Sequence, residues 1–193
     1  MEENPQQLKT SLQTLGPLQP EAWLQILQHQ KTIPLNPGES LVRKEGMLAY
    51  LSNGILKEYD ASNRKNPSII NFIKKGQPII TRRQNQVYYL KACTSCLVLY
   101  WESNDIKTLH QTFAELEHIY RSLCAQYDTS IAFRGLLLEE KSAIRKIQLF
   151  ISTNRDILPQ LKKKDMANYL NLDYDYFVRN FHGLITLAGI ALL

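Results

Sequence analysis

The sequence predicts an α+β protein, with a β-roll in its first half, a long helix after the roll and a helix-turn-helix unit at its C-terminal end. Three observations predict this order. Between residues 31 and 102, short extended runs alternate with turn residues about every eight to ten positions, a spacing typical of rolls and barrels. After residue 102, apolar and aromatic residues recur every seven positions, as in helices that pair. Near residue 165, two short helical patterns flank an asparagine.

Length and composition place the chain among globular proteins. It has 193 residues, of which 44% are hydrophobic, so it can bury a core of its own. The first 16 residues are polar and acidic, without the apolar stretch of a secretion signal, and no run approaches the roughly 18 apolar residues of a membrane span. Cys93, Cys96 and Cys124 are an odd number of cysteines, which fits reduced thiols. We therefore expect a cytoplasmic protein with no membrane partner.

Positive charge is concentrated in the last quarter of the chain. Residues 1–140 contain 15 Lys and Arg against 14 Asp and Glu, whereas residues 141–193 contain 8 against 4. A local excess of cations favours a polyanionic partner such as DNA. A lysine-rich surface that is merely solvated is the alternative that charge alone leaves open.

The first predicted unit, residues 1–102, combines two helical segments with the strands of the roll. Residues 5–30 have the leucine spacing of helices, interrupted at Gly16-Pro17. Gly54 can supply a turn or bulge between two strands. We predict strands at residues 31–35, 40–44, 48–60, 67–73, 87–93 and 96–102, the last two as a hairpin.

The second predicted unit, residues 103–138, is one long helix. Residues 103–134 contain no proline or glycine, and Ser103 can cap the helix N-terminus. A helix of about 30 residues is roughly 45 Å long, which is more than one small core needs. Two series with a seven-residue period therefore favour a dimer seam, although a helix packed on its own roll is the alternative. The predicted seam consists of Phe113, Leu116, Tyr120, Leu123 and Tyr127.

The third predicted unit, residues 139–193, contains the helix-turn-helix. Ala167 is small enough for a second helix to cross closely. Asn171 tolerates the positive φ that a tight turn needs. Asp173 is a good N-cap for the second helix, and Phe177 is expected to anchor that helix in the core.

The basic residues of this unit predict contacts with DNA. In helix-turn-helix units the second helix enters the major groove, and flanking cations hold phosphates. Residues 162–164 suit the phosphate role, and Arg179 can reach a guanine edge or a phosphate. The alternative is a pair of helices that packs on the roll and touches no nucleic acid. The predicted DNA-binding residues are Lys162, Lys163, Lys164, Tyr174, Asp175, Tyr176 and Arg179.

Four segments occur in an order that is informative together: NPGESLVRKEG (36–46), LAYLSNGILKEY (48–59), YLKACTSCLVLYWESNDIKTL (89–109) and KKKDMANYLNLDYDYFVR (162–179). In this order they resemble the cyclic-AMP receptor protein/Fnr (Crp/Fnr) family of bacterial transcription regulators, over about residues 30–181. The resemblance is greatest to short, divergent, Bacteroidetes-like members. It implies a cyclic-nucleotide-binding-like jelly roll, a dimerisation helix and a winged-helix-like DNA-binding module. It also implies a homodimer that binds double-stranded DNA and is not an enzyme.

The resemblance also implies where a cyclic nucleotide would bind. Nucleotide-binding members hold the phosphate with an Arg-Ser/Thr-Ala segment and the ribose with a Gly-Glu segment. The matching positions here are Gln86-Val87-Tyr88 and Gly76-Gln77, so glutamine replaces both the arginine and the glutamate. We therefore expect no response to cyclic AMP, and either an empty roll or one that holds an unknown small anionic effector. Nearby arginines can substitute for the lost one, or can simply lie on the surface. The candidate ligand-binding residues are Gly76, Gln77, Arg82, Arg83, Gln86, Val87 and Arg134.

Other chemistry is only weakly indicated. Cys93 and Cys96 have CxxC spacing without a second pair, so a metal site is not predicted and a redox switch is a minor hypothesis. No catalytic or cofactor-binding motif occurs, so we expect no enzyme activity, no cofactor and no metal. Val178 and Asn180 depart from the family pattern, and residues 182–193 form an apolar tail. A ligand-sensing or scaffold module with a decayed DNA-binding end is therefore the second hypothesis.

Overall fold

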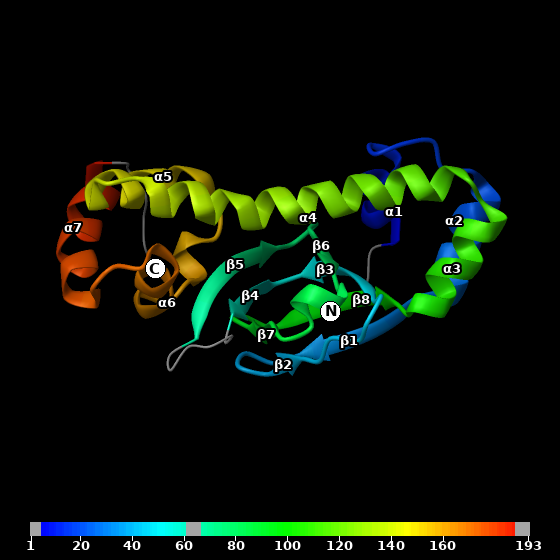
Figure 1. Ribbon diagram of the computed structural model, residues 1–193, viewed down its shortest axis with the longest axis horizontal. Coiled ribbons are helices and arrows are strands. Elements are labelled where there is room, and N and C mark those ends of the chain that lie inside the picture. The colour runs from blue at the N-terminus through cyan, green and yellow to red at the C-terminus, as the bar shows by residue number, and fades with distance from the viewer. Residues whose placement is uncertain (1–4, 61–66, 188–193) are drawn as a thin grey trace.

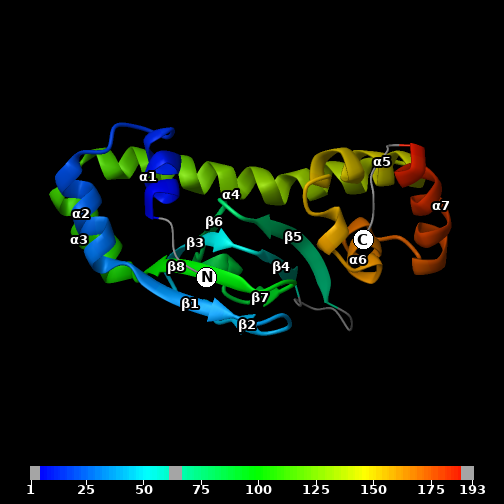
Figure 2. The same cartoon turned by 180° about the vertical axis from the view of Figure 1, so that it is seen from behind.

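The computed structural model describes residues 5–60 and 67–187. The molecule is elongated, with the roll in the middle and helix α4 (Glu115–Glu139) running along it (Figure 1). Helices α2 and α3 lie at one end, and α5 to α7 lie at the other (Figure 2). Among the described helices, none is long and apolar enough to cross a membrane.

Within the described residues, eight strands form a roll, the architecture that the turn spacing predicts. They make two four-stranded antiparallel sheets, ordered β1-β8-β3-β6 and β2-β7-β4-β5. Side chains from both sheets, among them Leu51, Leu56 and Leu90, form a buried apolar core. Between β3 and β4, Gly54 has φ +91°, and a Cβ there would lie 2.4 Å from the carbonyl oxygen of Ser95. The strands are β1 (Lys31–Leu35), β2 (Ser40–Leu41), β3 (Leu48–Asn53), β4 (Ile55–Asp60), β5 (Ser68–Lys74), β6 (Pro78–Ile80), β7 (Tyr89–Ala92) and β8 (Cys96–Trp101).

The predicted hairpin of residues 87–93 and 96–102 is wrong. β7 pairs with β2 and β4, whereas β8 pairs with β1 and β3, so these consecutive strands lie in different sheets. The break between them is a corner at which the chain crosses from one sheet to the other. The prediction also missed β6, because three residues are too few to show an alternating pattern.

Residues 5–30 form two helices, as predicted. They are α1 (Pro5–Gln13) and α2 (Pro20–His29). α1 buries Leu8 and Leu12, and both helices share a core with β3, β8 and the following helices. The indole Nε1 of Trp101 donates a hydrogen bond of 2.9 Å to the carbonyl oxygen of Ile26, which ties α2 to the end of β8.

The predicted single helix of residues 103–138 is two helices. α3 (Ser103–Thr112) ends at Phe113, whose backbone is extended with φ −129° and ψ 98°, and α4 begins shortly after it. α3 packs beside α2 through Ile106 and Leu109, whereas α4 packs along the roll, so tertiary contacts override helix propensity at the break. The N-cap of α3 is Glu102, one residue before the predicted Ser103.

After α4 the chain forms the helices of the third unit. They are α5 (Ala143–Asn154), the 3-10 turn η2 (Leu158–Gln160), α6 (Lys163–Leu170) and α7 (Tyr174–Leu187). No strand follows β8 within residues 67–187, so the winged-helix-like part of the prediction has no counterpart in the described structure. The predicted apolar tail begins inside α7, and its residues 188–193 lie outside the described region.

Candidate nucleic-acid interface and the roll interior

Helices α6 and α7 form a compact two-helix unit. Asn171 ends α6 in the left-handed conformation, with φ 52° and ψ 47°, as its residue type predicts. Asp173 caps α7, because its Oδ1 accepts a hydrogen bond of 2.9 Å from the backbone N–H of Tyr176. Phe177 is fully buried and stacks on Phe181, with ring centroids 4.8 Å apart. The predicted local geometry of the turn, the cap and the anchor is therefore confirmed.

The two departures from the family pattern leave this core intact. Asn180 donates a hydrogen bond of 2.8 Å from its Nδ2 to the carbonyl oxygen of Tyr176, and Phe181 takes the inward position one residue later. Val178 packs, partly buried, against the same core. The chain therefore keeps the packing of α7 with a different sequence.

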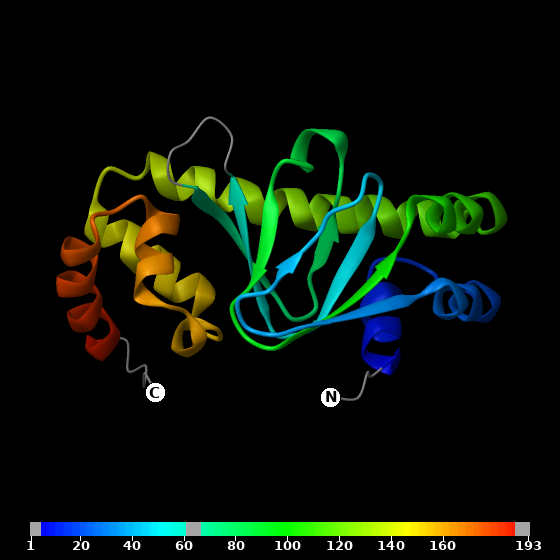
Figure 3. The same cartoon turned by 90° about the horizontal axis from the view of Figure 1, so that it is seen from below.

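The first half of α7 presents an open surface. The helix lies at the end of the molecule that is farthest from the N-terminal helices (Figure 3). Tyr174 and Tyr176 are 47% and 37% exposed, and Asp175 and Arg179 are exposed beside them. This surface combines hydrogen-bond donors, acceptors and aromatic faces, which are the groups that read base edges.

The predicted lysines lie at the start of α6. Lys162 and Lys164 are exposed, whereas Lys163 places its Nζ 2.9 Å from Nε2 of His182 on α7. Among the described residues, no carboxylate lies within 4.0 Å of Lys162, Lys164 or Arg179. These cations are therefore available to an anion from outside the chain.

A buried ion pair inside the roll, which is hydrogen-bonded to α4, was not predicted from the sequence. Nη1 of Arg43 lies 2.7 Å from Oε1 of Glu58, and the two side chains are 2% and 0% exposed. Tyr127 of α4 donates to the same Glu58 oxygen at 2.6 Å and accepts from Nη2 of Arg43 at 2.9 Å. Asn85 completes the network through its Nδ2, which donates to the Tyr127 hydroxyl at 3.2 Å. The alternation along β4, which puts Glu58 on the same face as Leu56, was the only signal for it in the sequence.

This network neutralises the buried arginine with a carboxylate of the same chain. Burial, together with the neighbouring Glu58 charge, raises the pKa of Tyr127 above its ordinary value, so its hydroxyl remains a donor. Two atoms in the network, Nε of Arg43 and Oε2 of Glu58, have no hydrogen-bond partner among the described protein groups. Arg43 is therefore already bonded to Glu58 and is not free to bind an anionic ligand.

The candidate ligand-binding residues lie on several elements, and their role in binding a ligand stays a prediction. Gly76 and Gln77 form the turn between β5 and β6. Arg82 makes a bidentate pair with Asp128 of α4, with distances of 2.8 and 3.0 Å. Arg134 is buried near the C-terminal end of α4. The remaining residues, Arg83, Gln86 and Val87, are exposed around the 3-10 turn η1 (Arg83–Asn85).

An open cleft of about 550 Å³ lies between β5, α4 and α5. Phe72 and Tyr169 give it aromatic walls, and the buried Asn71 adds a polar group. Lys74 is the only charged residue among its lining, and its Nζ is paired with Asp156 at 2.7 Å. The described lining therefore offers a small anion no cation that is without a partner.

The predicted dimer seam is wrong, because it faces the chain's own core. Leu116, Leu123 and Tyr127 are buried, and Phe113 and Tyr120 pack against the same cluster. The alternative prediction, a helix packed on its own chain, describes this face of α4.

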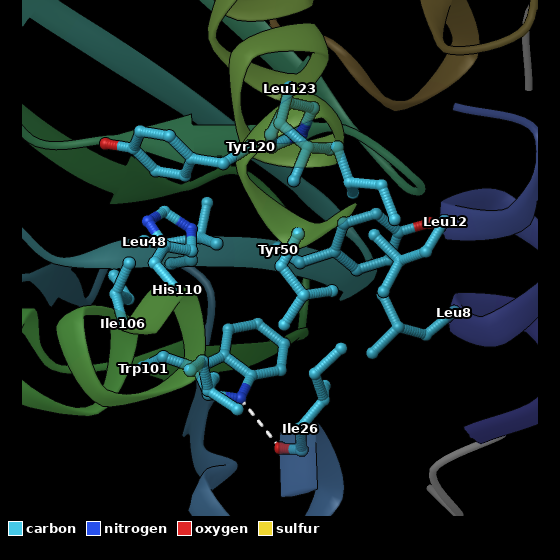
Figure 4. A pocket seen from close by; sticks show the side chains of 15 residues that line it. Leu8, Leu12, Ile26, Leu48, Tyr50, Trp101, Ile106, His110, Tyr120 and Leu123 are labelled. Carbon is cyan, nitrogen blue, oxygen red and sulfur yellow. Dashed lines mark hydrogen bonds between the residues drawn. The ribbon is translucent and has the colours of Figure 1, made fainter. Parts of the chain in front are cut away.

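An apolar cavity of about 50 Å³ lies inside that cluster (Figure 4). Leu8 and Leu12 of α1 close one side of it, and Tyr120 and His110 lie on another. Burial lowers the pKa of His110, so its ring is neutral near pH 7. The described lining offers almost no polar atom to orient a ligand, so the cavity has the properties of a packing void.

The opposite face of α4 is open. Ala125, Thr129, Ala132 and Leu136 are exposed, and Leu136 reaches 66%. Their spacing of four, three and four residues places them in one stripe along the helix, with the period of a coiled-coil seam. Three of the four side chains are small, so a second helix can approach this stripe closely.

Cys93 and Cys96 are free thiols. Burial raises the pKa of Cys93 to about 12 and also raises that of Cys96. Sγ of Cys96 donates to the carbonyl oxygens of Ile55 and Thr94, each at 3.3 Å. Since the thiolate is the reactive form, these protonated thiols disfavour the redox hypothesis.

A jelly roll closed by a long helix, with a two-helix unit after it, is the architecture of Crp/Fnr regulators. FixK2 from Bradyrhizobium japonicum is 15% identical, with a TM-score of 0.66 over 82% of this chain and 86% of that chain. A protein assigned to the Crp/Fnr family from Eubacterium rectale is 14% identical, with a TM-score of 0.67 over 91% of this chain and 87% of that one. A cyclic nucleotide-binding domain containing protein from Listeria monocytogenes is 11% identical, with a TM-score of 0.68 over 94% and 91%.

The sequence itself matches no family model and no curated protein. At identities of 11 to 15%, likeness to solved structures establishes the fold. The chain therefore has the Crp/Fnr fold, and the resemblance read from its sequence segments is confirmed at that level.

Proposed function

We propose that the chain is a homodimeric transcription regulator of the Crp/Fnr type that binds double-stranded DNA through α6 and α7. The observation that supports this most strongly is the open first half of α7 beside unpaired cations. In this mode of binding the second helix enters the major groove, and cations at its edge hold phosphates. Residues 162–164 then contact phosphates, and Tyr174, Asp175, Tyr176 and Arg179 face the bases.

The dimer in this proposal forms along the open stripe of α4. Ala125, Thr129, Ala132 and Leu136 replace the predicted seam, because the larger apolar residues are already covered by their own chain. Two DNA-binding units related by a two-fold axis would meet half-sites about one helical turn apart, roughly 34–36 Å. A pseudo-palindromic operator is therefore expected.

Cyclic AMP is not the effector in this proposal. A nucleotide phosphate needs an uncommitted cation, yet Arg43 is bonded to Glu58 and Arg82 to Asp128. Displacing Glu58 from Arg43 would leave a buried carboxylate without its counter-charge, which is strongly unfavourable. Equilibrium dialysis with labelled cyclic AMP is expected to show no saturable binding.

Selection of bound duplexes from a random library, using the purified protein, tests the proposal. The expected result is enrichment of a pseudo-palindromic site whose affinity falls linearly with salt on logarithmic axes. Arg179→Ala should relax the sequence preference, whereas Lys107→Ala, an exposed lysine on α3, should not.

Absence of any salt-sensitive binding would favour the second candidate, a ligand-sensing module without DNA activity. The cleft beside Phe72 and Tyr169 is the observation that favours this candidate.

A further inference from the structure

The side chain of Asn168 attaches helix α6 to the edge of the roll. Its Oδ1 accepts a hydrogen bond of 2.7 Å from the backbone N–H of Ile69, and its Nδ2 donates one of 3.1 Å to the carbonyl oxygen of Pro67. β5 is the outer strand of its sheet, so this side of it has no neighbouring strand. A C=O and an N–H two residues apart point to the same side of a strand, where a neighbouring strand would pair with both. The carboxamide of Asn168 therefore supplies the C=O and the N–H that one residue of a neighbouring strand would supply, and it covers this part of the open edge.

Polar contacts on either side of Asn168 fix both ends of α6. Near its start, Oδ2 of Asp165 lies 2.6 Å from Nζ of Lys57 on β4, with both side chains mostly buried. Burial lowers the pKa of Lys57, but its interactions with Asp165 and Tyr59 outweigh this effect and raise it, so the Lys57 ammonium is charged at neutral pH. Near the end of α6, the carbonyl oxygen of Tyr169 accepts a bond of 2.9 Å from Nε of Arg134 on α4. α6 is thus bonded to β4, β5 and α4.

The roll and the two-helix unit also share one hydrophobic core. The rings of Phe72 on β5, Phe150 on α5 and Tyr169 on α6 lie with their centroids 5.2 to 6.0 Å apart. Ile69 of the roll and Leu170 of α6 belong to the same cluster and are almost completely buried. Two parts that share a close-packed core cannot rotate against each other without opening it.

We infer that Asn168 is a positioning residue that docks α6 on the roll and so holds the reading helix α7 in one orientation without an effector. α7 packs only on α5 and α6 among the elements that it contacts extensively, so its orientation follows that of α6. The consequence for DNA binding rests on the proposed function, whereas the docking itself does not. A unit held in its binding orientation avoids the cost of ordering when it meets DNA.

Hydrogen exchange of the full chain, measured by mass spectrometry on peptides that cover residues 67–74, tests the docking. In Asn168→Ala the Ile69 amide loses its acceptor, and its protection is expected to fall about tenfold or more. Asn168→Asp keeps an acceptor for the Ile69 amide but has no donor for the Pro67 carbonyl, so the Ile69 amide should lose less protection than in Asn168→Ala. This variant replaces Asn168→Ala in the test if the alanine variant does not fold. Gln148→Ala, at an exposed position of α5, is the matched control and should change nothing.

Duplex affinity is the second readout. Asn168→Ala is expected to weaken binding to the selected duplex about tenfold with an unchanged salt slope, because the lysines remain. Unchanged exchange at residues 67–74 in both Asn168 variants would overturn the docking. Lost protection with unchanged duplex affinity would overturn the positioning role. A wild-type chain that binds no duplex would refute the proposed function and with it the positioning role, while the exchange result would still decide the docking.

Discussion

Replacing Glu58 with glutamine is expected to destabilise the fold strongly, because it leaves the guanidinium of Arg43 buried without a counter-charge. Oε1 of Glu58 meets Arg43 at 2.7 Å and the Tyr127 hydroxyl at 2.6 Å, and neither charged side chain is more than 2% exposed. Breaking such a pair costs about 3–5 kcal/mol, since an uncompensated charge remains. One kcal/mol corresponds to about 2–4 °C in a chain of this size, so Tm should fall by about 6–20 °C.

The double variant Arg43→Met with Glu58→Leu is the informative comparison. Apolar replacement of both buried charges is often neutral or stabilising by about 1–4 kcal/mol. Against this, the Tyr127 hydroxyl loses its bonds to both charges, and the backbone carbonyl of Asn85 loses a bond of 3.0 Å from Nη1 of Arg43, at about 1–3 kcal/mol for a buried group left unsatisfied. The double variant should therefore lie within about 2 kcal/mol of the wild type, whereas each single variant loses about 3–5 kcal/mol. Tyr127→Phe removes the bonds to both charged side chains, Glu58 and Arg43, and should cost at least about 1.5–3 kcal/mol, the contribution of one such bond.

Urea unfolding followed by tryptophan fluorescence measures these differences, and a double-mutant cycle extracts the interaction between the two charges. The expected coupling between Arg43 and Glu58 is roughly 4 kcal/mol or more. Additive losses in the double variant would refute the idea that the two charges compensate each other inside the roll.

Three further predictions follow from the surfaces and the thiols. Replacing Lys162–Lys164 with alanine should reduce the slope of log affinity against log salt by about 2.7 in fluorescence anisotropy, since each lost phosphate contact contributes about 0.9, and an unchanged slope would exclude these lysines as phosphate contacts. Leu136→Glu should dissociate the dimer in analytical ultracentrifugation, whereas Leu123→Ala should keep the dimer and cost about 2–5 kcal/mol of stability, because it faces the chain's own core; a dimer that survives Leu136→Glu would place the interface elsewhere. Cys93 should react with iodoacetamide at pH 8 about a thousandfold more slowly than an ordinary thiol, because burial raises its pKa from 9.0 to about 12, and rapid labelling of the folded chain in a mass spectrum would contradict this.

Local features of the fold were predictable because they depend on residue type alone. A left-handed residue at the turn and a carboxylate at the helix start are properties of Asn171 and Asp173 themselves, and both were predicted correctly. The hairpin at residues 87–102 was not predictable in this way, because spacing shows where strands end and not which strands pair. The break at Phe113 has the same origin: no helix-breaking residue marks it, and only packing against α2 and the roll requires it.

The dimer seam shows what a seven-residue period can and cannot decide. The period identifies an apolar face of a helix, but a partner chain and the chain's own core produce the same period. The prediction assigned the large residues, such as Leu123, to a partner. In the structure the roll and α1 cover them, and the stripe from Ala125 to Leu136 is left open. Small residues contribute little to an apolar periodicity, so the sequence pattern did not predict this stripe.

Buried polar contacts between distant segments were also beyond prediction, and they determine how the molecule can respond to a ligand. Asn168 and Ile69 are 99 positions apart, and both would be read as ordinary members of their own elements. The open cleft between β5, α4 and α5 has Asn71 of β5 and Tyr169 of α6 among its walls, so it lies beside the junction at which Asn168 docks α6. A ligand changes an orientation only by its difference in affinity for the two states. A ligand in this cleft would therefore change the orientation of α7 only if its affinity differed between the docked and the undocked states of α6.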